Sequence, residues 1–189
     1  MTAADAKREL RRQLRAVRQR ALGADPQAIT RAAAAALPPL LPPGGHLGLY
    51  WPMGSEPDLR PLADSLDPSA GRLALPAVSD GHLLYRPWHP GDPLTPDACG
   101  IPAPTGPALE PSRMALLLAP ALAFDRRGIR LGYGGGWFDR LRSDPAWRQV
   151  PALAVLPVAC LQEALPTDPW DVPFHGWLDE QGVHWLQPV

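Results

Sequence analysis

The hydrophobic positions near the N-terminus follow a helical period. Apolar residues recur at Leu10, Leu14, Val17 and Ala21, and a basic stripe beside them holds Lys7, Arg11 and Arg18. This spacing predicts a helix over residues 5–22 with one face on a core and a basic edge that can border a cleft. Asp25 followed by Pro26 is typical of a helix start, so we expect a second helix from there to Leu37, ahead of Pro38.

Downstream, short apolar runs alternate with helical patterns. Strands are expected at 47–51, 72–78, 82–88, 115–121, 150–156, 174–178 and 183–186, with a helix at 57–66 and another ending near residue 142. The proline-rich segment 89–113 predicts a long loop. The runs 115–121 and 150–156 are continuously apolar, as in strands that are buried on both faces. This order predicts a single layered α/β domain over residues 1–189 with a mainly parallel sheet.

The composition is that of a folded protein. Apolar residues make up 46% of the 189 positions and seven are tryptophan, which outweighs the disorder-prone content of 26 prolines and 17 glycines. The net charge of −1 argues against general binding to nucleic acids or anionic membranes. No run reaches the roughly 18 apolar residues of a membrane span, and no secretory signal is present, so we expect a cytoplasmic protein. Cys99 and Cys160 have no metal or redox spacing.

Lys7 is the only lysine among the 18 basic residues, and the chain has no asparagine. This skew suggests a GC-rich coding background in which arginine replaces lysine wherever the protein tolerates it. Lys7 is therefore a candidate for a position where a guanidinium cannot take the place of an ammonium. The alternative is that this lysine survives by chance near a chain end.

The strongest candidate for a binding site is segment 128–136. Five of its nine residues are glycine, it follows the buried strand 115–121, and it precedes a helix. Such a loop presents backbone N–H groups and a helix N-terminus to an anion, and Arg130 adds a fork that suits phosphate oxygens. It predicts a nucleotide polyphosphate cradle, although it lacks the Walker A lysine and has Trp137 where the dinucleotide fingerprint needs glycine. The alternative is a glycine-rich turn that packs a helix closely on the sheet.

Single residues elsewhere give weaker indications. Asp139 either holds Mg²⁺ against phosphates or is a helix-start carboxylate favoured by the helix dipole. Glu56 follows the aromatic pair 50–51, where it either binds the amines of a heterocycle or caps a helix. Trp88 belongs to an aromatic cluster whose default role is core packing. The histidines have no ligand spacing and there is no Gly-x-Ser-x-Gly elbow, so zinc and serine-hydrolase chemistry are unsupported.

Taken together, these segments resemble the 5-formyltetrahydrofolate cyclo-ligase family, also called 5,10-methenyltetrahydrofolate synthetases. The most specific match is residues 120–140, which are similar to the family pattern Pro-Gly-x-x-Phe-Asp followed by Gly-x-Arg-Leu-Gly-x-Gly-x-Gly-Tyr-Tyr-Asp. Supporting matches occur in the same order at Lys7 and Arg11, Tyr50 with Pro52 and Glu56, Leu75-Pro76, Trp88-x-Pro-Gly-Asp92, and Asp171. The resemblance covers essentially the whole chain.

The resemblance implies a three-layer α/β/α fold and an ATP- and Mg²⁺-dependent ligase. In the implied reaction, the formyl oxygen of 5-formyltetrahydrofolate attacks the γ-phosphate of ATP. N10 then attacks the iminium phosphate, which gives 5,10-methenyltetrahydrofolate, ADP and phosphate. The residues implied to hold ATP are Lys7, Arg11, Arg130, Leu131, Gly132, Tyr133, Gly134, Gly135, Gly136, Trp137 and Phe138, of which Lys7 and Arg130 are the catalytic candidates. Asp139 and Asp171 are implied to hold Mg²⁺, and Met53, Glu56 and Trp88 to line the folate pocket.

The sequence departs from the family pattern at two places. Trp137 and Phe138 replace a Tyr-Tyr pair, which removes two hydroxyl groups, and His175 replaces the second carboxylate of the C-terminal motif. We expect both to be compatible with activity, because the cationic positions and the first carboxylate are retained.

Other classes of protein remain as alternatives. A non-catalytic nucleotide- or folate-binding protein on the same fold would keep the glycine loop without needing Lys7. A sugar-phosphate isomerase or CoA-transferase relative would need its own base or nucleophile, and none is evident. RNA binding by the arginine-rich segment 8–20 is disfavoured by the charge balance. We expect a monomer that acts on a small molecule, without a nucleic-acid or membrane partner.

Overall fold

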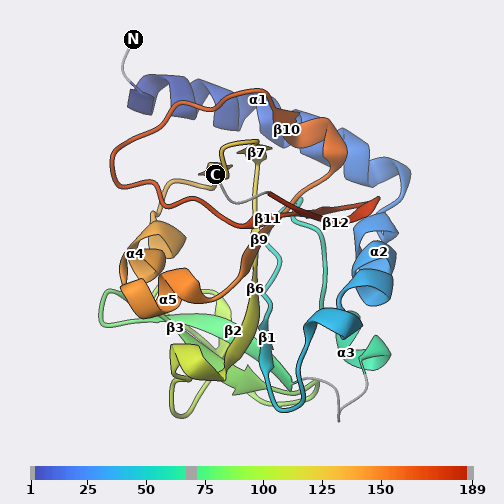
Figure 1. The fold of residues 1–189 in the computed structure, drawn as a ribbon, viewed down its shortest axis with the longest axis vertical. Helices are drawn as coiled ribbons and strands as arrows, with labels where there is room; N and C mark the ends of the chain where they lie inside the picture. Colours follow the sequence, from blue (N-terminus) through green and yellow to red (C-terminus); the bar gives the residue numbers. More distant parts are fainter. Residues whose placement is uncertain (1–2, 67–71, 187–189) are drawn as a thin grey trace.

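A seven-stranded sheet forms the centre of the molecule (Figure 1). The computed structural model describes residues 3–66 and 72–186. In spatial order the sheet contains β12 (Gly182–Trp185), β11 (Gly176–Asp179), β9 (Ala152–Val155), β6 (Met114–Pro120), β1 (His46–Gly48), β2 (Arg72–Ser79) and β3 (His82–Trp88). The strands from β11 to β2 pair in parallel, and β12 and β3 are antiparallel strands at the two edges. The predicted mainly parallel sheet is confirmed.

The central strands are buried on both faces, as their continuous apolar sequence predicts. Successive side chains of a strand point to opposite faces. On β6, Leu116 and Leu118 belong to one hydrophobic cluster, whereas Leu117 and Ala119 belong to another on the opposite face. Both faces of the sheet therefore need a covering layer of helices.

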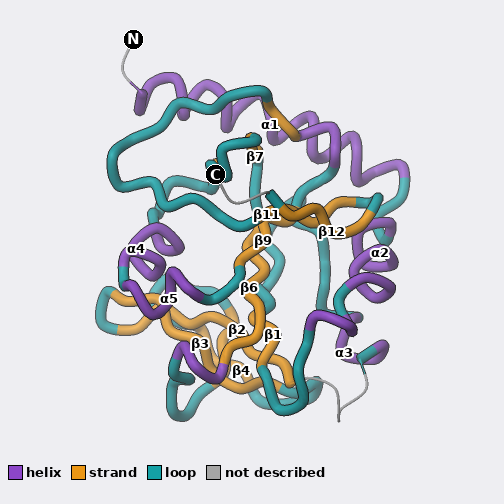
Figure 2. The backbone as a smooth tube through the Cα atoms, viewed as in Figure 1, coloured by secondary structure: helices purple, strands orange, loops and turns teal. Residues whose placement is uncertain are grey.

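The helices supply these layers (Figure 2). One face is covered by α2 (Ala28–Ala36) and α3 (Leu62–Ser65), and the other by α4 (Trp137–Ser143) and α5 (Pro145–Gln149). The long helix α1 (Ala3–Ala24) crosses the end of the molecule where the parallel strands finish. There it packs beside a small sheet of β10 (Leu161–Gln162), β7 (Ala123–Asp125) and β8 (Arg130–Leu131). The arrangement agrees with the expected three layers.

Two predicted helices differ from the observed ones. The second helix begins at Ala28 because the carboxylate of Asp25 accepts a hydrogen bond from the N–H of Gln27 at 3.2 Å and forms a turn instead of a cap. The segment 57–66 is helical only over Leu62–Ser65. Pro57 and Pro61 cannot donate backbone hydrogen bonds, which shortens this helix.

The predicted loop 89–113 contains a short hairpin of β4 (Leu94–Pro96) and β5 (Pro102–Pro104). The carboxylate of Asp97 organises this hairpin, since it accepts hydrogen bonds from the N–H groups of Val78, Cys99 and Ile101 at 2.8 to 3.0 Å. Such local side-chain bonds leave no periodic hydrophobic signal in the sequence. Three short 3₁₀ turns complete the fold: η1 (Pro38–Leu40), η2 (Pro111–Arg113) and η3 (Val158–Cys160). Within the described ranges, no helix combines the length and apolar character that crossing a bilayer requires.

Candidate active site

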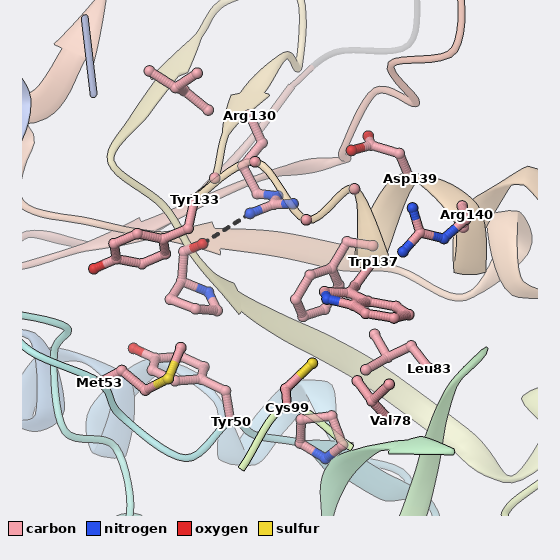
Figure 3. A pocket seen from close by; sticks show the side chains of 18 of the residues that line it. Tyr50, Met53, Val78, Leu83, Cys99, Arg130, Tyr133, Trp137, Asp139 and Arg140 are labelled. Atoms are coloured by element: carbon pink, nitrogen blue, oxygen red, sulfur yellow. Dashed lines mark hydrogen bonds between the residues drawn. The ribbon is translucent and has the colours of Figure 1, made fainter. Parts of the chain in front are cut away.

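A cavity of about 750 Å³ opens where the parallel strands end. Figure 3 shows its two walls. The glycine loop and α4 form one wall, with Arg130, Trp137, Asp139 and Arg140. The loop after β1 and the hairpins β2–β3 and β4–β5 form the opposite wall, with Tyr50, Met53, Val78, Leu83 and Cys99. The N-terminal end of α1 and segment 168–171 close the cavity. Ligands of open α/β sheets bind at this edge.

The glycine loop has a backbone that side chains would not tolerate. Gly134 and Gly136 have positive φ angles of 105° and 64°. At Gly135, an added Cβ would lie 2.7 Å from the indole of Trp137. Within the described chain, no acceptor bonds the N–H groups of Gly134, Gly135 and Gly136. The loop therefore presents free backbone donors next to the start of α4, which is an arrangement that suits an anion.

Arg130 supplies a positive charge to the cavity wall that holds these donors. Its Nη1 donates to the carbonyl oxygen of Pro120 at 3.0 Å, and its Nε is buried with no partner in the described ranges. Its guanidinium lies 4.9 Å from the ring centre of Phe138 and 5.4 Å from that of Phe174. Burial lowers the pKa of Arg130, and attraction to Asp139 and more distant acids opposes this. No ion pair with a carboxylate forms at Arg130 in the part of the chain that the structure describes.

Helix α1 contributes Lys7 and Arg11 to the same cavity, as the basic stripe predicts. Arg11 Nε donates to the carbonyl oxygen of Gly132 at 2.8 Å, which fixes the start of the glycine loop. Lys7 Nζ lies 2.7 Å from Asp168 and 2.6 Å from Asp171. Burial alone would lower the pKa of Lys7, but its hydrogen bonds to the two carboxylates raise it, so the ammonium is charged.

Asp139 and Asp171 both line the cavity although 32 positions separate them along the chain. Asp139, in the first turn of α4, accepts a hydrogen bond from the N–H of Val172 at 3.2 Å, and this bond joins α4 to the segment that carries Asp171. In each carboxylate one oxygen makes no hydrogen bond with the described residues. The ion pair of Asp139 with Arg142 that a helix-start role would favour is absent from the described chain, because Arg142 donates to backbone carbonyls.

Glu56 is the buried carboxylic acid of the opposite wall, and the residue is 7% exposed. Its Oε2 accepts from the N–H of Met53 at 2.8 Å, whereas Oε1 is buried and has no partner among the described residues. Burial raises the pKa of Glu56 to about 7, since the Met53 hydrogen bond and the charges of Arg18 and Arg130 compensate only partly. The group is thus able to donate or accept a hydrogen bond near neutral pH. It does not cap a helix.

Two residues that the sequence singled out do not line the cavity. Trp88 is 5% exposed, packs in the core cluster with Leu47 and Leu73, and is not among the residues that line the cavity. It sits on β3 opposite Leu73, where its side chain enters the core. His175 also lies outside the cavity lining, and its Nδ1 accepts from the N–H of Ala152 at 3.1 Å. This bond joins the residue before β11 to the first residue of β9 and gives position 175 a structural role.

The replacement of the Tyr-Tyr pair leaves aromatic faces in place. The ring of Trp137 lies 4.3 Å from the guanidinium of Arg140, and Phe138 packs on Arg130. Arginines stack favourably on such faces without any hydroxyl group.

Several cavity residues escaped the sequence analysis. Asp168 and Trp170 line the cavity, and Asp168 holds Lys7. Asp168 lies three residues before Asp171, and this spacing of acidic residues was an available signal. Cys99 and Arg140 also line the cavity, but nothing in their local sequence indicates it.

The fold and the site define a layered α/β protein in which a glycine-rich loop with free backbone donors meets a largely apolar cavity. The chain belongs to the 5-formyltetrahydrofolate cyclo-ligase family, whose model matches residues 3–178. It is 31% identical to the 5-formyltetrahydrofolate cyclo-ligase of Escherichia coli K12 over 133 residues, and this alignment covers 67% of this chain and 73% of that protein. The enzyme of the same name from Haemophilus influenzae is 32% identical over 136 residues, with coverages of 68% and 72%.

A solved structure agrees with the fold. The NMR structure of Aquifex aeolicus 5,10-methenyltetrahydrofolate synthetase superimposes with a TM-score of 0.71 at 24% identity, over 100% of this chain and 95% of that one. At this identity the likeness concerns the fold. It confirms the predicted fold class.

Proposed function

We propose that this cavity is where the chain performs the reaction of its family, the ATP-dependent ring closure of 5-formyltetrahydrofolate to 5,10-methenyltetrahydrofolate. One observation carries the assignment to this cavity. Arg130, which has no carboxylate partner among the described residues, lines the same cavity as three glycines with unbonded N–H groups, and both features favour a polyphosphate. The apolar opposite wall, with Met53 and the free Oε1 of Glu56, suits a heterocycle that carries amine groups.

The chemistry asks for positioning and charge stabilisation more than for a nucleophile. The formyl oxygen attacks the γ-phosphorus and ADP leaves; N10 then attacks the formyl carbon, and phosphate departs with the former formyl oxygen. Arg130 and the glycine N–H groups stabilise the charge of the transferred phosphoryl group. Glu56 holds the heterocycle through its free Oε1. The wall opposite the loop excludes water from the iminium phosphate.

Lys7 has two acidic neighbours, and the three charges together leave one negative charge. We infer that Lys7 turns toward the phosphates of ATP when these enter, because the ammonium remains charged and lies at the cavity wall. An ammonium fits this tight position between two carboxylates, where a planar guanidinium would need more space.

Mg²⁺ fits the end of the cavity where Lys7 lies. Asp139 and Asp171 each keep one free carboxylate oxygen, and Mg²⁺ prefers such hard oxygen ligands. In the described ranges no three His, Cys, Asp or Glu side chains form a ready metal cluster. Mg²⁺ that arrives with a nucleotide needs only one or two carboxylates, the remainder being phosphate oxygens and water. When bound, the ion would neutralise phosphate charge.

The activity is tested by the absorbance of the methenyl product, with and without ATP. We expect product only with ATP, and a strong loss of rate in Arg130→Ala. Arg126→Ala is the matched control, because Arg126 is exposed and lies outside the cavity lining. Binding of ATP and folate without any product would favour the alternative, a non-catalytic binding protein on the same fold.

We further propose that the chain works in the cytoplasm as a monomer built of one domain over residues 1–189. The net charge of −1 gives it no general affinity for nucleic acid or anionic membranes. Sedimentation at several protein concentrations tests the monomer, and a mass that rises with concentration would contradict it.

A further inference from the structure

Helix α1 presents its basic stripe to successive parts of the site. Lys7 lies at segment 168–171, and Arg11 binds the start of the glycine loop. Arg18, two turns beyond Arg11, lies on the same face of the helix. Unlike the other two, it is completely buried and does not line the cavity. Its function must therefore be exerted through its neighbours.

The guanidinium of Arg18 connects three separate segments. Its Nη1 donates to the carbonyl oxygen of Ala121 at 3.1 Å, just after β6. Its Nε lies 3.2 Å from Ser55 Oγ, in the loop between Met53 and Glu56. Its Nη2 donates to the hydroxyl of Tyr133 in the glycine loop, and the guanidinium also lies 5.4 Å from the centre of that ring. Within the described residues, Arg18 is the one side chain that hydrogen-bonds both loops.

This charge is buried without an ion-pair partner in the part of the chain that the structure describes. A buried cation is costly unless its donors are satisfied, and here neutral oxygens satisfy them. An apolar residue would fill such a position at lower cost. The planar guanidinium of Arg18, however, holds Ser55 and Tyr133 at a fixed separation, which an apolar side chain cannot do.

We propose that Arg18 is a positioning residue that couples the nucleotide side of the cavity to its folate side; this rests on the function proposed above. ATP orders the glycine loop and thereby Tyr133. Through Arg18 this ordering also fixes the position of Ser55 and of the adjoining Met53 and Glu56. The residues that contact the folate are then in position before the folate binds. By linkage the effect is reciprocal, and each substrate tightens the binding of the other by the same factor.

The test measures the Kd of adenylyl imidodiphosphate, a non-hydrolysable ATP analogue, without and with saturating 5-formyltetrahydrofolate. We expect the folate to lower this Kd at least about fivefold in the original protein. Ser55→Ala should reduce the factor to below about twofold, although Ser55 does not line the main cavity. Tyr133→Phe keeps the ring and removes only the hydroxyl, and it should have the same effect. The double variant Ser55→Ala/Tyr133→Phe should show no further reduction of the coupling factor, because both hydrogen bonds belong to the same connection through Arg18.

Arg12→Gln is the matched control on α1, since Arg12 is exposed and pairs with Glu9; it should retain the full coupling factor. If Ser55→Ala lowers the melting temperature but keeps the factor, Arg18 is merely structural and this inference is overturned. A factor of one in the original protein also overturns it. Neither result affects the proposed function, which fails instead if the original protein forms no methenyl product with ATP.

Discussion

The buried carboxyl group of Glu56 makes the stability of the protein depend on pH near neutrality. Burial raises its pKa from 4.5 to about 7. The folded state therefore holds the proton more tightly than the unfolded chain does. The tighter binding of the proton stabilises the folded state. This stabilisation is fully present below the pKa of Glu56 in the unfolded chain and is lost as the pH rises through its pKa in the folded protein. With these two values, the free energy of unfolding falls by about 2 kcal/mol between about pH 5.5 and about pH 8.5.

Glu56→Gln removes the ionisation and keeps the size of the side chain. Urea unfolding of both proteins at the two pH values gives the required free energies. Over this range the free energy of unfolding of the original protein should fall by about 2 kcal/mol more than that of the variant. The contributions of the histidines cancel in this comparison because the histidines titrate in both proteins. If the two free energies change in parallel, Glu56 does not carry a raised pKa and our account of the folate wall is wrong.

Lys7→Arg should fold normally but lose roughly tenfold or more in turnover, because a planar guanidinium needs more space than the ammonium that lies between Asp168 and Asp171. Unchanged turnover would show that the enzyme does not require a lysine at this position. Arg130→Ala should cost on the order of 2–4 kcal/mol in transition-state stabilisation, or roughly 30- to 1000-fold in rate, and a large fall in melting temperature with intact ATP affinity would contradict this. Asp139→Asn and Asp171→Asn should each raise the Mg²⁺ concentration for half-maximal turnover by roughly tenfold. An Asp171→Asn enzyme with unaltered Mg²⁺ dependence would show that Asp171 is not a ligand.

The strands buried on both faces and the helix with a single apolar stripe were the elements that sequence reasoning predicted well. Their periodicity reports burial directly, as at β6 and α1. The starts of short helices were predicted poorly. At Asp25 and in segment 57–66, side-chain turns and prolines decide where the helix begins, and such local competition is not visible in hydrophobic periodicity.

The glycine loop and the stripe of Lys7 and Arg11 could be found from sequence, because glycine content and helical spacing mark them. Trp88 packs in the core and does not line the cavity; an aromatic residue at a strand end can point to the core or to a cavity, and only tertiary packing selects between these. Asp168 and the burial of Arg18 depend on contacts between segments more than 100 positions apart. The spacing of Asp168 and Asp171 draws attention to that segment, but local sequence does not show which distant residues these side chains contact.

The fate of the formyl oxygen tests the central claim most directly. 5-Formyltetrahydrofolate labelled with ¹⁸O in the formyl group is incubated with the protein, ATP and Mg²⁺, and the inorganic phosphate is analysed by mass spectrometry. If the formyl oxygen attacks the γ-phosphate in this cavity, one ¹⁸O atom enters the phosphate for each methenyl group formed, and Arg130→Ala slows both products together. Methenyl product accompanied by unlabelled phosphate would contradict the account.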